Sequence, residues 1–104
     1  MKDNMSQTEV AINEDVTIKY TVPKKYCVII HNDDSTPMEF VIELLIGIYN
    51  HTQDNATTIT IEVHEKGRGV AGVYYFEMAE QKVYESTIAS RNAGFPLSFT
   101  IEEK

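Results

Sequence analysis

The sequence contains little cysteine, no long apolar run and few basic residues. Its one cysteine, Cys27, excludes an internal disulfide framework and a zinc site built from several cysteines. No segment approaches the roughly 20 apolar residues that a membrane helix needs, and residues 1–24 lack the apolar run of a signal peptide. We therefore expect a soluble protein without membrane contact in a reducing compartment, either the cytoplasm or, in a photosynthetic eukaryote, the plastid stroma.

Basic residues number 9 against 16 acidic residues, which gives a formal net charge of −7. Most of the excess acidic charge lies after residue 24. Because an acidic domain repels a phosphate backbone, we expect no nucleic-acid partner. The charge instead favours a ligand or a partner that presents positive charge.

The chain has 104 residues and a mass of 11.8 kDa, the size of one ordinary domain. Its 42% hydrophobic and 24% charged residues are typical of a globular protein. A chain of this length can bury one core but has no room for a large cofactor, and we expect none. Residues 1–24 are polar and predict a flexible N-terminal extension. Residues 25–104 form the predicted domain.

The residue pattern after position 24 predicts three strands and two clear helices. Residues 26–30 are apolar and rich in β-branched side chains, as in a buried strand. Similar patterns predict strands over 68–76 and 97–101. A helix over 77–93 is indicated by acidic residues in its first turn and by a glycine just beyond its end.

The clearest local signal is the start of another helix. Thr36 can cap this helix, Pro37 fits its first position, and Glu39 completes a capping box. Apolar residues at helical spacing then continue to about Asn50. The sequence therefore predicts a helix from this capping box to about that asparagine.

Residues 53–66 fit two structures. Ile59, Ile61 and Val63 alternate with polar residues, which favours a strand. A helix would place Ala56 and Val63 on one face, and a glycine just after the segment could end it. Propensity alone favours the strand.

The polar loop 31–34, with the sequence HNDD, lies between the first predicted strand and the first helix. Such loops often carry function, although Asn and Asp also suit an inert turn. A metal site would combine the loop with His64, but the spacing matches no standard site, and we predict no metal. A catalytic site would pair Ser35 or Thr36 with His64, but no nucleophile signature is present, and we predict no enzyme.

Residues 26–40, with the sequence YCVIIHNDDSTPMEF, resemble the signature of the ClpS family. ClpS proteins are adaptors that deliver substrates to ATP-dependent Clp proteases. The resemblance continues after the signature, through AT at 56–57, VH at 63–64, GVY at 72–74, EMAEQKV at 77–83 and PL at 96–97. It therefore extends over nearly all of the predicted domain.

The resemblance implies an α/β domain of the α+β type with the order β-α-α-β-α-β, in which a three-stranded antiparallel sheet packs against three helices. It thereby favours the helix over residues 53–66. It also implies a function: the adaptor binds N-degrons, which are free protein N-termini that begin with Leu, Phe, Tyr or Trp. It then delivers them to an AAA+ unfoldase of the ClpA or ClpC type. We expect the adaptor to be a monomer.

The resemblance also implies a binding site with two parts. Asn32, Asp33, Asp34 and His64 would hold the α-amino group, which is mostly a cation at neutral pH because its pKa is about 7.7–8.0. These side chains offer acceptors to the three N–H donors of the amine. Which of the two aspartates contacts the amine is left open. An apolar hole would take the first side chain, lined by Thr36, Met38, Val41, Thr60, Val63 and Leu97.

One position departs from the family pattern, because many members have methionine where this chain has Thr60. Threonine is smaller, so we expect an altered ranking among Leu, Phe, Tyr and Trp, with more room for aromatic residues; an unchanged ranking in a Thr60→Met protein would contradict this. Glu77 and Lys82 match positions that face the unfoldase in the family. The extension 1–24 matches the segment that engages the ATPase during delivery.

Two rival hypotheses belong to other classes of protein. One is a small enzyme that uses His64 with Asp33 and Asp34, which requires turnover or a bound metal. The other is a structural interaction domain, similar in topology to the C-terminal domain of the ribosomal stalk protein. In that domain Asn32 and His64 would be dispensable.

Overall fold

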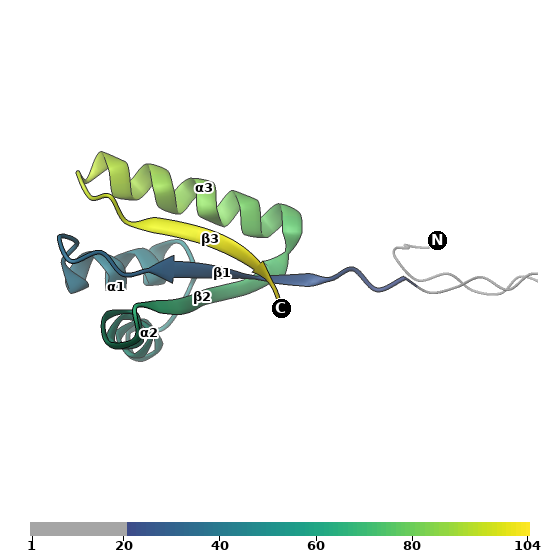
Figure 1. The fold of residues 1–104 in the computed structure, drawn as a ribbon, viewed down its shortest axis with the longest axis horizontal. Helices are drawn as coiled ribbons and strands as arrows, with labels where there is room; N and C mark the ends of the chain where they lie inside the picture. The colour runs from purple at the N-terminus through teal and green to yellow at the C-terminus, as the bar shows by residue number, and fades with distance from the viewer. Residues whose placement is uncertain (1–20) are drawn as a thin grey trace, which may run out of the picture.

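A computed structural model describes residues 21–104, and residues 1–20, most of the predicted extension, lie outside the described part. The chain order is β-α-α-β-α-β, which confirms the predicted fold class (Figure 1). The elements are β1 (Lys25–His31), α1 (Met38–Gly47), α2 (Gln53–Lys66), β2 (Arg68–Tyr75), α3 (Phe76–Asn92) and β3 (Ser98–Glu103).

The sheet has the order β2-β1-β3, and both pairs of strands are antiparallel. β1 lies at the centre of the sheet, and Val28 and Ile30 of its apolar run are fully buried. The register with β2 shifts between Val28 and Ile29, so Ala71 bulges out of the ladder. A His51 ring nitrogen, Nε2, lies within hydrogen-bonding distance of the Ala71 carbonyl oxygen, which ties the α1–α2 connection to this bulge.

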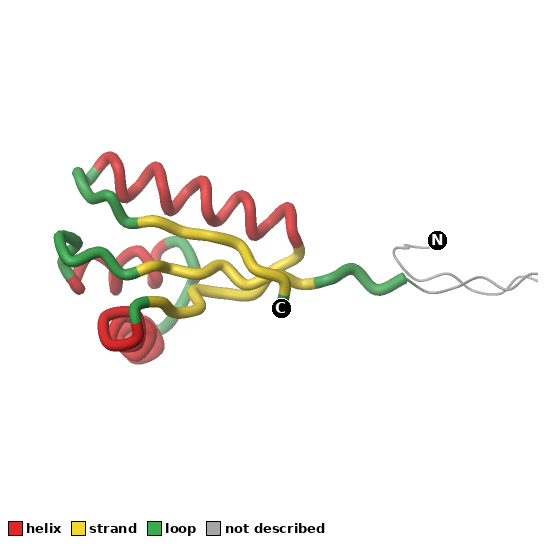
Figure 2. The backbone as a smooth tube through the Cα atoms, in the orientation of Figure 1, coloured by secondary structure: helices red, strands yellow, loops and turns green. Residues whose placement is uncertain are grey.

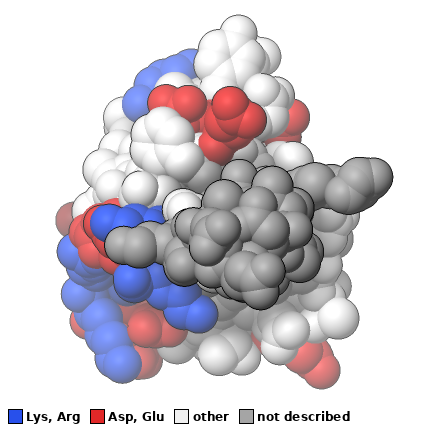
Figure 3. Space-filling view, turned by 90° about the vertical axis from the view of Figure 1, so that its right-hand side faces the viewer, with Lys and Arg blue, Asp and Glu red and all other residues white. Residues whose placement is uncertain are grey.

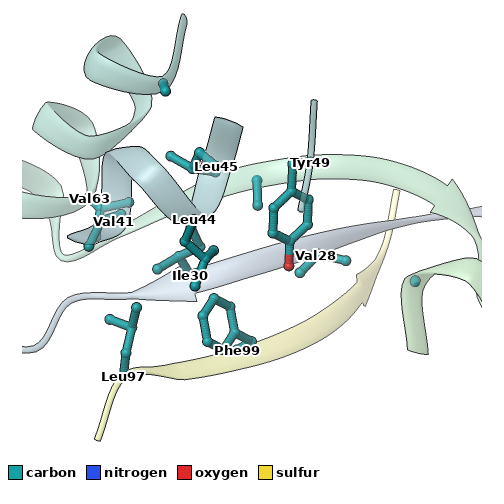
Figure 4. Close-up of a cluster of buried hydrophobic side chains, with 12 residues drawn as sticks. Val28, Ile30, Val41, Leu44, Leu45, Tyr49, Val63, Leu97 and Phe99 are labelled. Carbon is teal, nitrogen blue, oxygen red and sulfur yellow. The ribbon is translucent and has the colours of Figure 1, made fainter. Parts of the chain in front are cut away.

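All three helices contribute side chains to one core over the face of the sheet that carries Val28 and Ile30. Leu44 and Leu45 of α1 lie above Ile30, and Phe99 of β3 closes the core beside them (Figure 4). In the turn after α1, the Tyr49 hydroxyl lies 2.6 Å from the hydroxyl of Ser86 on α3. Burial raises the pKa of Tyr49 well above its ordinary value, so the ring stays neutral in this contact.

The predicted capping box at the start of α1 is wrong. The helix begins at Met38, its N-cap residue is Pro37, and no side chain caps it. The hydroxyl of Thr36 instead donates to Oδ2 of Asp33 over 2.7 Å. A capping side chain accepts from a backbone N–H of the first turn, but the cap position is taken by Pro37, one residue after Thr36, and proline has no side-chain acceptor. The helix also ends at Gly47, before the predicted Asn50.

Residues 53–66 form a helix, so the strand that propensity favoured is wrong and the helix implied by the resemblance is confirmed. Both ends of the helix are capped. At the start, the Thr52 side chain accepts from the backbone N–H of Asn55, and at the end Gly67 adopts a left-handed conformation with φ 88°. Between these ends, Ala56 and Val63 are buried against the core, whereas Ile61 is exposed. End signals and one buried face thus outweigh the alternating pattern.

Three connections of the fold lie at the same end of the sheet (Figure 2). These are the β1–α1 loop, the α2–β2 turn and the α3–β3 loop, because β1 ends where its antiparallel neighbours begin. The backbone N–H of Asn32 donates to the Gly67 carbonyl over 2.9 Å and joins the first two of these connections. Side chains from distant parts of the chain therefore meet at this end.

Candidate binding site

A hollow of about 240 Å³ lies at this end of the sheet. It is formed by the β1–α1 loop, the first turns of α1, the second half of α2 and the residue before β3. It contains all ten residues predicted for the amine and side-chain sites. The lining residues are Asn32, Asp33, Asp34, Thr36, Pro37, Met38, Val41, Thr60, Val63, His64 and Leu97.

One part of the hollow presents hydrogen-bond acceptors. The Asn32 amide group donates from Nδ2 to Oδ1 of Asp34 over 3.2 Å. This contact fixes the amide orientation and leaves the carbonyl oxygen of Asn32 free to accept. His64 comes from the last turn of α2, and the bond between Asn32 and Gly67 holds that turn against the loop. The Asn32 oxygen, the Asp34 carboxylate and the imidazole of His64 belong to residues that line the same hollow.

Asp33 has a different set of contacts from Asp34. Its Oδ2 accepts from the hydroxyls of both Ser35 and Thr36, each over 2.7 Å. The hydrogen bonds from Thr36 and Ser35 lower the pKa of the Asp33 carboxyl below its ordinary value. Asp33 therefore stays ionised and holds the loop in shape, while it also contributes negative charge to the hollow.

The other part of the hollow is apolar and well buried. Val41 and Val63 lie side by side at one end of the core (Figure 4), and Leu97 is 1% exposed. Met38 lies at the rim with 38% of its surface exposed. Thr60 is 2% exposed, and its hydroxyl donates to the Ala56 carbonyl over 2.8 Å, within its own helix. The wall of this part is therefore mostly hydrocarbon. The Thr60 hydroxyl has no proton left to donate to a ligand, because it donates within its own helix.

Leu97 is held in place by a contact that the residue pattern does not predict. The guanidinium of Arg91 donates from Nη1 to the carbonyl oxygens of Phe95 (3.0 Å) and Leu97 (2.7 Å). These bonds fix the α3–β3 loop over the hollow. A basic residue in the last turn of a helix is a signal for contact with nearby carbonyls, but the pattern does not specify which carbonyls. Pro37 also lines the hollow and was predicted only as a helix residue.

The catalytic alternative has no support in these contacts. Ser35 and Thr36, its two candidate nucleophiles, both donate to Asp33 rather than to His64. Within residues 21–104, no group of three or more His, Cys, Asp or Glu side chains could hold a metal ion. None of the helices in that part of the chain is both long and apolar enough to cross a membrane.

Glu77 and Lys82, the predicted unfoldase contacts, lie on α3 and do not line the hollow. Glu77 is exposed, whereas Lys82 is partly buried. The Lys82 ammonium donates to the Ile48 carbonyl at the C-terminal end of α1 over 2.6 Å. It also lies 5.9 Å from the centre of the Tyr74 ring. Lys82 therefore has a structural role that Glu77 does not share.

A second, more open hollow lies where β2 passes into α3, and we call its surface the β2–α3 corner, lined by Lys25, Val73, Tyr74, Tyr75 and Met78. Lys104 is close because its backbone N–H donates to the Lys25 carbonyl. Figure 3 views this end of the molecule, where basic side chains, drawn in blue, lie next to acidic ones beside an uncharged region. In the sequence, Glu77 lies between Tyr75 and Met78 of this corner.

Together, the fold and the first hollow define a class of protein: a small binding domain for a ligand with a cationic end and an apolar body. Acceptors converge at one part of the hollow, and buried hydrocarbon lines the other. Such a combination of a mostly apolar cavity with a few placed polar groups is typical of ligand sites.

Comparisons with known proteins identify the family. A model of the family described as ATP-dependent Clp protease adaptor protein ClpS matches residues 21–100. An ATP-dependent Clp protease adapter protein ClpS from Lawsonia intracellularis is 51% identical over 81 residues, 78% of this chain and 74% of that protein. One from Nitratidesulfovibrio vulgaris is 44% identical over 103 residues, 99% of each chain.

A solved structure is similar as well. The structure of Agrobacterium tumefaciens ClpS2 bound to L-phenylalaninamide is 37% identical with a TM-score of 0.77. The similarity covers 80% of this chain and 100% of that one. This chain therefore belongs to the ClpS family. It is an adaptor of an ATP-dependent Clp protease, which is its partner, and a binding protein rather than an enzyme.

Proposed function

We propose that this adaptor binds N-degrons that begin with Leu, Phe, Tyr or Trp and delivers them to a Clp AAA+ unfoldase of the ClpA or ClpC type. One observation carries the proposal: the acceptor groups and the apolar hole share a single hollow. A protein N-terminus has an ammonium group and a side chain on the same carbon atom. A ligand of this kind needs both parts of the hollow at once.

The ammonium is held by acceptors alone. Its three N–H donors are met by the Asn32 oxygen, by a ring nitrogen of His64 and by Asp34, directly or through water. Asp33 supports this arrangement through the loop that it holds. An acetylated N-terminus has no charge and fewer donors, so it leaves these acceptors without partners. Each unpaired acceptor costs on the order of 1–3 kcal/mol, which is the basis of discrimination.

The first side chain enters the apolar part of the hollow. Burial of a Leu or Phe side chain contributes roughly 1.5–3 kcal/mol. Together with the charge-assisted bonds to the amine, this supports binding near −8 kcal/mol, which corresponds to a micromolar dissociation constant. Met38 at the rim has an adaptable side chain, which suits both aliphatic and aromatic guests.

The structural relative supports the same assignment. L-phenylalaninamide, the molecule bound to Agrobacterium tumefaciens ClpS2, has a free α-amino group and a benzyl side chain, and its carboxyl group is an amide. It therefore has the chemical form of the first residue of a peptide. We propose that this chain takes a ligand of the same form.

Delivery uses other parts of the molecule. We assign the unfoldase contact to the exposed Glu77 and to the β2–α3 corner beside it, where apolar side chains are exposed. Lys82 belongs to this contact only through the part of its side chain that remains exposed. The extension 1–24 engages the ATPase after docking, and the adaptor acts as a monomer in the cytoplasm.

A peptide titration tests the binding step. Peptides Leu-X and Phe-X, with free and with acetylated N-termini, are titrated against the wild type and Asn32→Ala. We expect micromolar binding of the free forms to the wild type only, and a loss of roughly tenfold to a hundredfold in the variant, because a charge-assisted hydrogen bond is removed. Equal binding of free and acetylated peptides would overturn the proposal.

A further inference from the structure

We propose that Oγ1 of Thr60 is a hydrogen-bond acceptor inside the apolar hole and that it favours N-degrons whose first side chain carries a donor. This proposal rests on the proposed N-degron function and refines its substrate class. Tyr and Trp, which carry an O–H and an N–H donor, are then preferred over Phe and Leu, which carry none.

The hydrogen bonds of Thr60 determine what it can offer. Its hydroxyl proton is committed to the Ala56 carbonyl over 2.8 Å. The oxygen keeps its capacity to accept, because a hydroxyl group has one donor and two acceptor positions. Thr60 lines the hollow although only 2% of its surface is exposed. It is therefore a buried acceptor that water reaches only through the hollow.

The position of Thr60 matches the path of an entering side chain. Thr60 precedes His64 by four residues on α2, so the two lie on the same helix face, about 6 Å apart along the axis. His64 lies at the amine part of the hollow. A side chain that extends from the amine carbon towards the helix start thus approaches Thr60, and a ring substituent reaches further than any atom of leucine.

The surroundings of Thr60 make its oxygen distinctive. Val41, Val63 and Leu97, which share the hole with it, have hydrocarbon side chains. Thr36 is the other hydroxyl in the lining; its proton is donated to Asp33, and the Thr36→Val variant below tests whether it is the partner instead. We assign the partner of a donor on the first side chain to Thr60.

The contact with Thr60 discriminates between first side chains because a side chain that fills the hole excludes water. A phenylalanine ring that fills the hole displaces water from the Thr60 oxygen and supplies no donor. A tyrosine ring supplies its hydroxyl in place of the water. A net hydrogen bond of this kind changes affinity roughly threefold to tenfold. The expected preference is thus Tyr over Phe and Trp over an N-methylated Trp.

The test uses two ligand pairs and three proteins. Tyr-X is compared with Phe-X, and Trp-X with its 1-methyl analogue, all with free N-termini. Each pair is titrated against the wild type, Thr60→Val and Thr36→Val. Valine has the shape of threonine without the oxygen, and Leu-X binding to the same variants reports whether the hollow is formed. We expect the Tyr-to-Phe affinity ratio to fall roughly threefold to tenfold in Thr60→Val, and not in Thr36→Val.

The outcomes separate the two proposals. If wild-type protein binds Leu-X and Phe-X but does not favour Tyr-X, and the ratio is the same in Thr60→Val, the acceptor role is overturned and N-degron binding stands. A fall in the ratio with Thr36→Val instead also overturns the role of Thr60. If no free N-terminus binds the wild type, both proposals are overturned. In the wild type, O-methylated Tyr-X should bind more weakly than Tyr-X, which tests the donor without any substitution.

Discussion

The hollow at the end of the sheet and the hollow at the β2–α3 corner differ in how their polar groups are arranged. In the binding pocket, Thr36 and Thr60 have committed their hydroxyl protons to other groups of the protein, and the apolar wall is almost completely buried. At the β2–α3 corner the lining is apolar but open, with Val73, Tyr75 and Met78 exposed by 37%, 52% and 49%. The first hollow is organised before a ligand arrives, and the second is not.

This difference indicates what each hollow can recognise. A small ligand such as a single N-terminal residue contributes few contacts, so its site needs acceptors that are already oriented. A folded partner contributes a large area, so exposed apolar side chains with a charged residue nearby are enough to begin an interface. Substitutions in the two places should therefore separate ligand binding from delivery.

The largest effect is expected for Asp34→Asn. The substitution removes a negative charge at the proposed amine site, while the amide oxygen that replaces it can still accept from Asn32. We expect affinity for a free Leu-X peptide to fall roughly tenfold or more, as for loss of a charge-assisted contact. Fluorescence anisotropy with a labelled peptide measures this fall.

The matched control is Asp33→Asn. An amide oxygen at this position can still accept from Ser35 and Thr36, the two hydroxyls that now bind Asp33. We expect less than half of the free-energy loss seen at Asp34. Equal losses at the two positions would show that both carboxylates act on the amine by charge.

A smaller effect, on delivery alone, is expected for Tyr75→Ser at the corner. The substitution removes an exposed aromatic ring, a residue type that often dominates protein interfaces. We expect roughly threefold to tenfold slower degradation of an N-degron substrate at limiting adaptor concentration, with unchanged peptide affinity. Tyr84→Ser is the matched control, because Tyr84 is 65% exposed on α3 and does not line the corner. Similar slowing by both substitutions would remove the corner from the interface.

Much of the fold was predictable because several signals agreed. The apolar run of β1, the acidic first turn of α3 and the glycine just beyond α3 agree with the elements that the structure contains. The segment 53–66 was not predictable from propensity, because its alternating Ile59, Ile61 and Val63 fit a strand. The helix became evident only from motifs spread along the whole domain, which reflect the tertiary packing that overrides local preference.

The residues that line the hollow were predictable from the sequence, but the hydrogen bonds among them were not. The motif brought together Asn32 and His64, and the structure places both at one hollow. The motif could not show that α1 begins one residue later than predicted, which leaves Thr36 outside the cap position and bonded to Asp33. Arg91 acts on Leu97 across the α3–β3 loop, and its partners depend on the path of that loop. The hydrogen-bond partner of each side chain depends on the positions of the groups in space, which a residue pattern does not specify.

The smallest effect on function is expected for a substitution of Lys82. Slower delivery by such a variant has two explanations, a less stable fold and a lost partner contact. Lys82→Met keeps the aliphatic stem but removes the ammonium that donates to the end of α1 and lies near the Tyr74 ring. We expect the free energy of unfolding to fall by about 1–2 kcal/mol, since a partly exposed charge-assisted bond is lost. Urea denaturation measures this as a lower midpoint with an unchanged slope.

Glu77→Gln provides the contrast, because Glu77 is exposed and none of the hydrogen bonds or ion pairs found within residues 21–104 involves its side chain. A surface change of this kind alters stability by no more than about 0.5 kcal/mol. Slower delivery by the Glu77 variant would then report a lost partner contact, whereas slower delivery by the Lys82 variant has to be corrected for its lower stability. If Lys82→Met is as stable as the wild type, the structural role of the ammonium is contradicted, and slower delivery by that variant would then report a lost partner contact.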